Sequence, residues 1–252
     1  MTPRHSAECA TAGGGFFMTK FTIRIKGLFS LIILLALTGC IERSSDIASV
    51  EKCPAPSQKT ELINLSLAKE RIEAYYECGQ YDRDMDAIVN QVISHFSKIS
   101  PENNAAVVFD IDDTVLSSYC DEKSISFGYI PEFAHEWVMR ADAPAIAQSK
   151  KLYDYLVKHG FHVIFLTGRK LDEYDATLKN LREQGFSTFD KLIVRSPAEE
   201  QLSAQEYKTA HRSQLTKEGY HIVGSVGDQW SDLEGGNVGY KVKLPNYRYL
   251  LR

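Results

Sequence analysis

Several features that would place this chain in other classes of protein are absent or scarce. The formal net charge of its 252 residues is −4, and no stripe of lysine and arginine runs along it, which argues against a nucleic-acid polymer as a partner. Internal repeats and low-complexity tracts are absent, and the length suits one α/β domain with a core of ordinary size. The seven histidines show no His-x-x-x-His spacing, so they predict no histidine metal site.

The apolar run near the N-terminus is too short to span a bilayer comfortably. Leu28–Leu37 is an apolar run of about ten residues, whereas a spanning helix needs about 20. Basic residues precede the run, and small residues follow it before a break, which is the arrangement of a secretory signal. We therefore predict that residues 18–39 are a signal peptide. Residues 1–17 do not fit the basic start of a signal, so we expect them to be an upstream extension and translation to begin at Met18.

The end of this signal, Leu37-Thr38-Gly39-Cys40, resembles the bacterial lipobox, whose cysteine is lipidated and becomes the mature N-terminus. The resemblance implies a lipid anchor at Cys40 in a bacterial cell envelope, and several acyl chains would make membrane attachment stable. Ile41 stands where an aspartate commonly retains lipoproteins in the inner membrane, so we expect the outer membrane. A periplasmic or secreted protein, or an uncleaved anchor, is the alternative. Residues 40–59, with two prolines, are predicted to form a tether.

Cysteines are few, and they do not define a disulfide framework. Apart from Cys9 and Cys40, the chain has Cys53, Cys78 and Cys120, and three thiols allow one bridge and leave one free. A Cys53–Cys78 pair would tie the N-terminal segment to a helix in an oxidising compartment. No base at a recognisable spacing argues for thiol catalysis by Cys120, so we expect it to be structural.

The most informative segment is an apolar run that stops at three closely spaced carboxylates. Val107-Val108-Phe109 reads as a strand and leads to Asp110, Asp112 and Asp113. Two such charges about 4 Å apart repel by roughly 1–4 kcal/mol, so the cluster needs a cation, a shared proton or open solvent. A turn that starts with aspartate is the simpler alternative. A calcium-binding EF-hand is excluded because Val115 stands where that loop needs glycine.

Three later segments also bring polar side chains to the ends of predicted elements. The run 161–166 ends in Thr167-Gly168-Arg169, a group that suits an oxyanion because glycine lets backbone N–H groups approach. The run 221–226 leads to Asp228 and then Asp232. A capping box, Ser203-Ala204-Gln205-Glu206, predicts a helix whose first turns carry Lys208.

Strands alternate with helices along the chain, which predicts an α/β fold with a mainly parallel sheet and helices on both faces. Carboxyl ends of strands form the ligand site in such folds. The predicted helices lie near 60–77, 82–98, 131–140, 142–159 and 172–184, with another opening at Ser203, and the predicted strands lie at 105–110, 161–166, 190–194, 221–226 and 239–243.

The order of these residues resembles the haloacid dehalogenase (HAD) superfamily. Asp110, Asp112 and Thr114 match its first motif, Asp-x-Asp-x-Thr/Val, and Gly227-Asp228-Gln229-Trp230-Ser231-Asp232-Leu233 is similar to the signature of bacterial lipoprotein and plant vegetative-storage-type acid phosphatases. The resemblance covers residues 60–245 and implies a HAD-like Rossmannoid three-layer sandwich, with N-terminal helices and a small helical cap at about 116–141. The other three motifs are matched by Thr167, by Lys208, and by Asp228 with Asp232.

The resemblance also implies the chemistry of the site. Asp110 would be the nucleophile that forms an aspartyl-phosphate, and Asp112 would be the general acid and base. Mg²⁺ would be held by Asp110, the Asp112 backbone carbonyl and Asp228. Dehalogenases need no acid two residues after the nucleophile, so the presence of Asp112 favours phosphate esters over carbon–halogen bonds.

The remaining residues of the motifs are expected to act on the phosphoryl group. Thr167, the Gly168 amide and Lys208 would bind its oxygens, and Asp232 would orient the metal shell or Lys208. The short cap predicts an open site for small phosphomonoesters such as nucleoside monophosphates. A phosphotransferase with the same residues and a non-catalytic surface lipoprotein are the alternatives. Four cap aromatics either line the mouth of the site or pack the cap: Phe127, Tyr129, Phe133 and Trp137.

Overall fold

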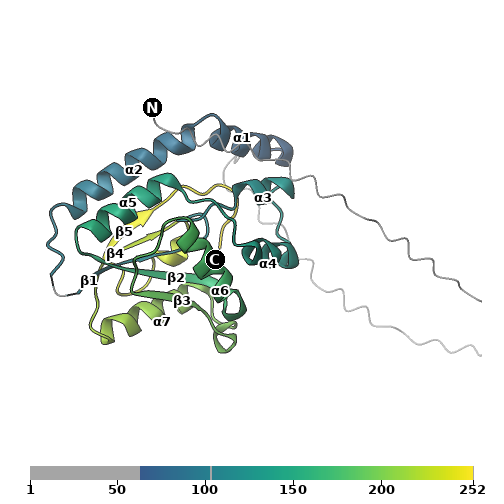
Figure 1. Cartoon of the computed structure of the whole chain (residues 1–252). Coiled ribbons are helices and arrows are strands. Elements are labelled where there is room, and N and C mark those ends of the chain that lie inside the picture. Colours follow the sequence, from purple (N-terminus) through teal and green to yellow (C-terminus); the bar gives the residue numbers. More distant parts are fainter. Residues whose placement is uncertain (1–62, 103, 252) are drawn as a thin grey trace, which may run out of the picture. The chain divides into compact units, whose positions relative to one another are not determined.

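The computed structural model describes residues 63–102 and 104–251, and the predicted signal peptide, lipidation site and tether lie outside these residues. Its centre is a sheet of five parallel strands in the order β3-β2-β1-β4-β5 (Figure 1). The strand order reverses beside β1, and ligands of open α/β sheets bind at such a switch point. The strands are β1 (Ala105–Phe109), β2 (His162–Lys170), β3 (Lys191–Arg195), β4 (His221–Gly227) and β5 (Tyr240–Lys243).

Helices lie on both faces of the sheet, with α2 and α5 on one face and α7 on the other (Figure 1). The two helices between β1 and α5, α3 and α4, occupy the stretch predicted to be a small cap, although the sequence did not predict α3. The helices are α1 (Leu65–Glu77), α2 (Gln80–Phe96), α3 (Tyr119–Ser124), α4 (Pro131–Arg140), α5 (Ala147–Lys158), α6 (Tyr174–Glu183) and α7 (Ala204–Lys217).

The central strand β1 is buried along its whole length. Val107 and Phe109 join the core that contains α2 and α5, whereas Ala106 and Val108 join the core that contains α7. Side chains alternate between the two faces of a strand, so a continuous apolar run is typical of a parallel strand covered on both sides. The predicted three-layer α/β fold is confirmed.

One helix begins later than the sequence predicts. The helix expected from residue 142 begins at Ala147. The Asn180 side chain binds both the N–H of Ala143, at 3.1 Å, and its carbonyl, at 2.9 Å, and the Gln184 side chain accepts from the N–H of Ala145. Pro144 also disfavours a helical conformation in the residue before it. These contacts hold the segment out of the helix.

The predicted Cys53–Cys78 disulfide is wrong. Cys78 follows the last residue of α1 as an exposed, free thiol, whereas Cys120 in α3 is disulfide-bonded. Cysteine counting allows one bridge among three thiols but does not select the pair, because the distances in the folded chain decide it.

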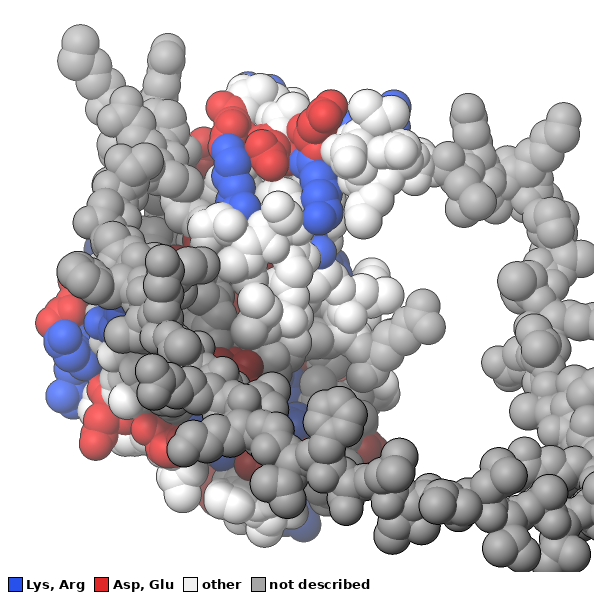
Figure 2. Space-filling model, turned by 90° about the vertical axis from the view of Figure 1, so that its right-hand side faces the viewer, with Lys and Arg blue, Asp and Glu red and all other residues white. Residues whose placement is uncertain are grey.

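Acidic and basic side chains lie next to one another on the face that Figure 2 turns to the viewer. Lys123 of α3 pairs with Glu77 and lies 3.4 Å from Glu73, both on α1, and Arg140 of α4 pairs with Asp121 of α3. Such exposed pairs add little stability because water screens them. Within the described part of the chain, no helix has the length and apolarity needed to cross a membrane.

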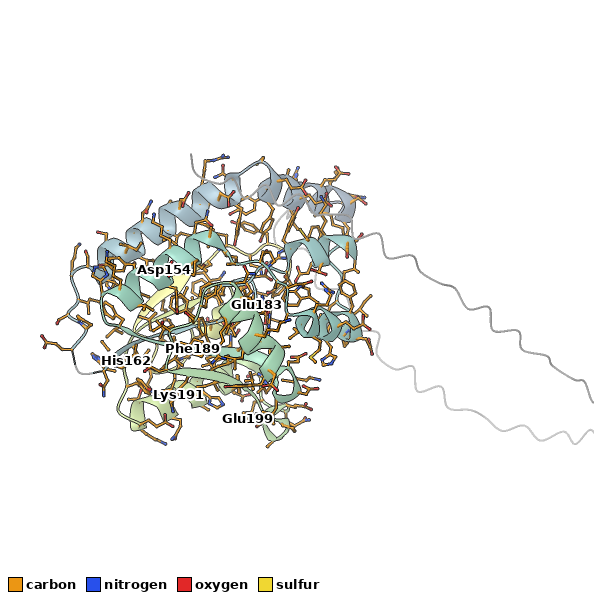
Figure 3. All side chains as sticks on the ribbon, viewed as in Figure 1. Asp154, His162, Glu183, Phe189, Lys191 and Glu199 are labelled. Atoms are coloured by element: carbon orange, nitrogen blue, oxygen red, sulfur yellow. The ribbon has the colours of Figure 1, made fainter. Side chains whose placement is uncertain are left out.

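Other charged residues lie far from the switch point. His162 and Lys191 are the first residues of β2 and β3 (Figure 3), and they pair with Asp190 and Glu218. They mark the amino ends of the strands, whereas Asp110 follows the carboxyl end of β1. These pairs therefore take no part in the site described below.

Candidate active site

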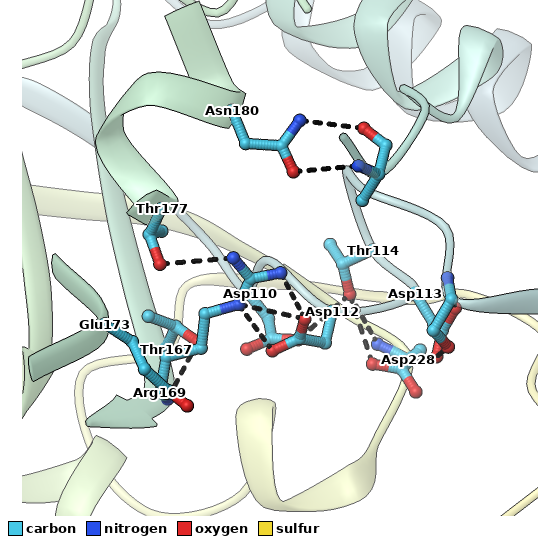
Figure 4. Close-up of polar contacts among 12 residues, drawn as sticks. Asp110, Asp112, Asp113, Thr114, Thr167, Arg169, Glu173, Thr177, Asn180 and Asp228 are labelled. Atoms are coloured by element: carbon cyan, nitrogen blue, oxygen red, sulfur yellow. Dashed lines mark hydrogen bonds and ion pairs between the residues drawn. The ribbon is translucent and has the colours of Figure 1, made fainter. Parts of the chain in front are cut away.

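The ends of β1 and β4 bring two aspartates of the predicted site together (Figure 4). Asp110 directly follows β1, and Asp228 directly follows β4. The Thr114 hydroxyl lies between them, 3.3 Å from Asp110 Oδ2 and 3.2 Å from Asp228 Oδ1, and it accepts a hydrogen bond from the backbone N–H of Asp228. Thr114 is fully buried, so it fixes the separation of the two carboxylates.

Helix α7 delivers the predicted lysine to the same place. The capping box of Ser203 and Glu206 starts the helix as predicted, and Lys208 follows in its first turns with only 6% of its surface exposed. Its Nζ lies 2.5 Å from Asp110 Oδ1 and also donates to Asp232 Oδ1. Burial lowers the pKa of Lys208, but the carboxylates of Asp110 and Asp232 outweigh this effect and raise the pKa above the usual lysine value. The group is therefore an ammonium.

The loop after β4 is shaped so that Asp232 can receive this ammonium. A Cβ at Gly227 would lie 2.3 Å from the Cβ of Asp232, so only glycine permits the close approach. The second Asp232 oxygen accepts from the backbone N–H of Gln229 at 2.9 Å. Arg212, one turn after Lys208 on α7, donates to the carbonyl of Asp232 at 2.8 Å. Both oxygens of Asp232 are thus engaged by the protein.

The carboxylates are crowded enough to favour a divalent cation. One oxygen each from Asp110, Asp228 and Asp232 lies within 4.8 Å of the others. Burial raises the pKa of Asp110, Lys208 opposes this, and Asp232 and Asp228 add to the rise. Burial and Asp232 likewise raise the pKa of Asp228 to about 6. A hard cation with oxygen ligands fits this donor set and would hold the carboxylates in the charged form.

Residues after β4 and β5 hold the second oxygen of Asp228. Gln229 Nε2 donates to Asp228 Oδ2 at 2.6 Å, and Asn246 Nδ2 donates to the same oxygen at 2.7 Å. Lys243 Nζ donates to the Asp228 carbonyl at 2.6 Å. These contacts leave Oδ1 facing Thr114 and Asp110. Asn246 is not predicted from the sequence, because it lies in an irregular segment where no motif or periodicity marks its contact.

The predicted phosphate-binding residues lie near the carboxyl end of β2. The hydroxyl of Thr167 is buried and accepts from the backbone N–H of Arg169 at 3.2 Å. Gly168 is exposed, and a Cβ there would meet nothing within 4 Å. The space beside the Gly168 backbone is therefore open. The roles of Thr167 and Gly168 stay predictions.

Arg169 takes a different partner from the one that its sequence context suggests. The run Thr167-Gly168-Arg169 predicts a group that faces an oxyanion, yet the Arg169 guanidinium binds the Asp112 carboxylate, with Nη2 2.7 Å from Oδ1 (Figure 4). The anion bound by Arg169 is therefore a side chain of the protein itself. Asp112, the predicted general acid and base, is thus held at the side of the site.

A second buried charge cluster joins the C-terminal segment to the loop after β1. Asp113 accepts from Ser118, pairs with Arg248 and accepts from the Tyr249 hydroxyl at 2.9 Å. Despite burial, Arg248 and Ser118 hold the pKa of Asp113 below its usual range. Burial and Asp113 raise the pKa of Glu122, which also pairs with Arg248, to about 7. Arg248 and Tyr249 are not predicted from the sequence, because they lie outside any predicted element.

The cap aromatics divide between packing and exposure. Trp137 of α4 is buried, and its ring lies 5.2 Å from the Arg169 guanidinium carbon. Phe127 lies 6.3 Å from the ring of Tyr119, whereas Tyr129 is 80% exposed. The packing interpretation therefore holds for Trp137, and Tyr129 is free to meet a ligand.

Comparison with known proteins gives the class of this molecule. Residues 42–251 match the model of the HAD superfamily, subfamily IIIB (acid phosphatase), so the chain belongs to this family. It is a phosphomonoester hydrolase of the acid phosphatase type. The predicted family and class of enzyme are confirmed, and enzymes of this superfamily usually use a divalent metal.

The chain is also similar to individual proteins. The stem 31 kDa glycoprotein of Glycine max is 35% identical over 227 residues, which are 85% of this chain and 87% of that protein. Acid phosphatase 1 of Solanum lycopersicum is 34% identical over 179 residues, 69% of this chain and 66% of that protein. The solved class C acid phosphatase from Bacillus anthracis shares the fold, with a TM-score of 0.61 at 22% identity over 74% of this chain and 85% of that chain.

Proposed function

We propose that this acid phosphatase is Mg²⁺-dependent and hydrolyses small phosphomonoesters through an aspartyl-phosphate on Asp110. The observation that carries the proposal is the position of Asp110 at the end of β1, bonded to the Lys208 ammonium and next to Asp228. An ammonium and a cation beside the carboxylate reduce its electrostatic repulsion toward an approaching phosphoryl dianion.

In the first step, an Asp110 oxygen attacks phosphorus while the bond from phosphorus to the ester oxygen breaks. Asp112 gives its proton to the departing oxygen, so the product is a neutral alcohol. Lys208, the Thr167 hydroxyl and the Gly168 amide hold the phosphoryl oxygens. A bound Mg²⁺ would be held by Asp110, Asp228 and the Asp112 carbonyl, and would neutralise charge on the phosphoryl group.

In the second step, Asp112 takes a proton from water as the water attacks the phosphorus of the aspartyl-phosphate. Phosphate leaves, and the Asp110 carboxylate is restored. If an alcohol replaces water, the same residues perform phosphotransfer, and product analysis with an added acceptor alcohol separates the two outcomes. Family membership favours an enzyme over the non-catalytic surface protein that the sequence leaves as an alternative.

We propose small substrates, among them nucleoside monophosphates. The cap between β1 and α5 holds only two short helices, which would leave room for a leaving group of variable shape. Tyr129, which lies just before α4 and is largely exposed, offers a ring against which a flat base would stack.

The decisive experiment measures phosphate release by the purified protein with Mg²⁺ and with a chelator, across pH. We expect release that stops when the cation is removed. Because the pKa of Asp228 is about 6, protons compete with the cation below that pH, so half-maximal activity should need more Mg²⁺ as pH falls. Asp112→Asn should lower turnover of an alkyl phosphate by about 10²- to 10⁴-fold. Full activity in the chelator would refute the metal requirement.

We also propose that Cys40 is lipidated and that the enzyme is anchored in a bacterial cell envelope, with the outer membrane as the expected location. The proposal rests on the sequence of residues 18–40, and the plant relatives reported above weigh against it. Expression in a bacterium that processes lipoproteins, followed by detergent phase partitioning, tests it. The wild-type chain should partition with detergent, and Cys40→Ser should move it to the aqueous phase. A wild-type chain in the aqueous phase would contradict lipidation.

A further inference from the structure

Arg169 grips the predicted general acid with more than one hydrogen bond. Its Nη2 lies 2.7 Å from Asp112 Oδ1, and its Nε lies 3.1 Å from Oδ1 and 3.3 Å from Oδ2. The guanidinium is a planar fork that matches a carboxylate, so such a contact fixes the orientation of the carboxyl plane as well as its distance.

Two helices contact the arginine side chain besides Asp112. Its Nη1 donates to the Thr177 hydroxyl of α6 at 3.1 Å. On the cap side, the Trp137 ring of α4 lies 5.2 Å from the guanidinium carbon. Figure 4 shows the arginine extended between Thr177 and Asp112. These contacts restrict the conformation of the Arg169 side chain.

Burial is unequal across the pair. The Arg169 side chain is 3% exposed, whereas the Asp112 side chain is 31% exposed. The arginine is therefore inaccessible to a substrate, and the aspartate is not. The longest of the three contacts ends on Asp112 Oδ2, so this oxygen is the one with capacity left for a proton.

We propose that Arg169 is a positioning residue for proton transfer, because it holds Asp112 where Oδ2 can pass a proton to the departing ester oxygen. The inference rests on the proposed function. Preorganisation of this kind removes the need to fix a rotating side chain in the transition state. A purely structural ion pair would also stabilise the fold, but it would not make activity depend on the leaving group.

The dependence of activity on the leaving group can be tested with two substrates. kcat/KM for a phosphate ester covers the steps up to departure of the alcohol. 4-Nitrophenolate departs without a proton, whereas a simple alkoxide needs one. We expect Arg169→Gln to lower kcat/KM for an alkyl phosphate by about 100-fold or more and for 4-nitrophenyl phosphate by less than about tenfold. Arg169→Lys, which keeps the charge but loses the fork, should fall between, and so should Thr177→Val, which removes only the anchor.

Controls separate the possible failures. Arg195→Gln changes an arginine at the end of the neighbouring strand β3, where it binds the Leu202 carbonyl, and it should leave the ratio between the two substrates unchanged. Circular dichroism and thermal unfolding verify the fold of each variant, and Arg169→Lys and Thr177→Val keep the test open if Arg169→Gln does not fold. Equal losses on both substrates, or none, would overturn the positioning role while leaving the proposed function standing. If the wild-type protein showed no metal-dependent phosphate release, both the positioning role and the proposed function would be overturned.

Discussion

Asparagine in place of Asp110 is expected to remove phosphate release almost completely, by about 10⁴-fold or more, while the fold is kept. An amide oxygen is a poor nucleophile, and the neighbouring carboxylates are held by other contacts. Asp228 is bonded to Gln229 and Asn246, and Asp232 to Lys208 and Gln229. Asp112 pairs with Arg169, and Asp113 pairs with Arg248.

The fold should survive because the substitution removes a charge from a crowded, buried place. Burial and neighbouring carboxylates already raise the pKa of Asp110, and asparagine resembles the protonated side chain in size. Steady-state phosphate release and thermal unfolding in metal-free buffer measure the two effects. Acid quenching during turnover, followed by intact mass spectrometry, should show a phosphorylated wild-type chain and none in Asp110→Asn. Asp121→Asn, in an exposed pair on α3, is the matched control. A phosphorylated Asp110→Asn protein would end the proposal.

Methionine in place of Lys208 should cost both stability and activity. The ammonium is the buried partner of Asp110 and Asp232, and its removal leaves two buried carboxylates without a cation. Breaking a buried pair from one side typically destabilises a protein by about 3–5 kcal/mol. Denaturant unfolding without metal measures the loss. Turnover should also fall by at least about 100-fold, because a charge that binds the phosphoryl group is lost.

A double variant separates the two roles of this lysine. Lys208→Met with Asp232→Asn removes one of the stranded charges, so the free energy of unfolding should recover in part. Activity should stay low, because neither substitution restores an ammonium to the phosphoryl group. If the double variant regained activity together with stability, Lys208 would be a structural residue alone.

Local sequence patterns suffice for the elements that deliver the site. The apolar run that ends at Asp110 predicts β1, and the capping box of Ser203 and Glu206 predicts the start of α7 at Ala204. From these ends the meeting of Asp110, Asp228 and Lys208 follows, because parallel strands present their carboxyl ends at one edge of the sheet. Here the local preferences and the global fold agree.

Sequence patterns fail where a distant side chain decides the outcome. Asn180 binds the Ala143 carbonyl, which a longer α5 would have used in its first turn. Arg169 is predictable as a cation at a strand end, but its partner is 57 residues away along the chain. Asn246 and Arg248 follow the last strand in a segment without regular structure, and their contacts have no periodicity from which they could be read.

The segment after β5 holds residues of the proposed site, although it contributes nothing to the sheet. Asn246 holds Asp228, Tyr249 holds Asp113, and the backbone N–H of Leu251 donates to Gln229 at 3.0 Å. We therefore expect that trimming these residues by an exopeptidase that digests from the C-terminus would lower the rate of phosphate release.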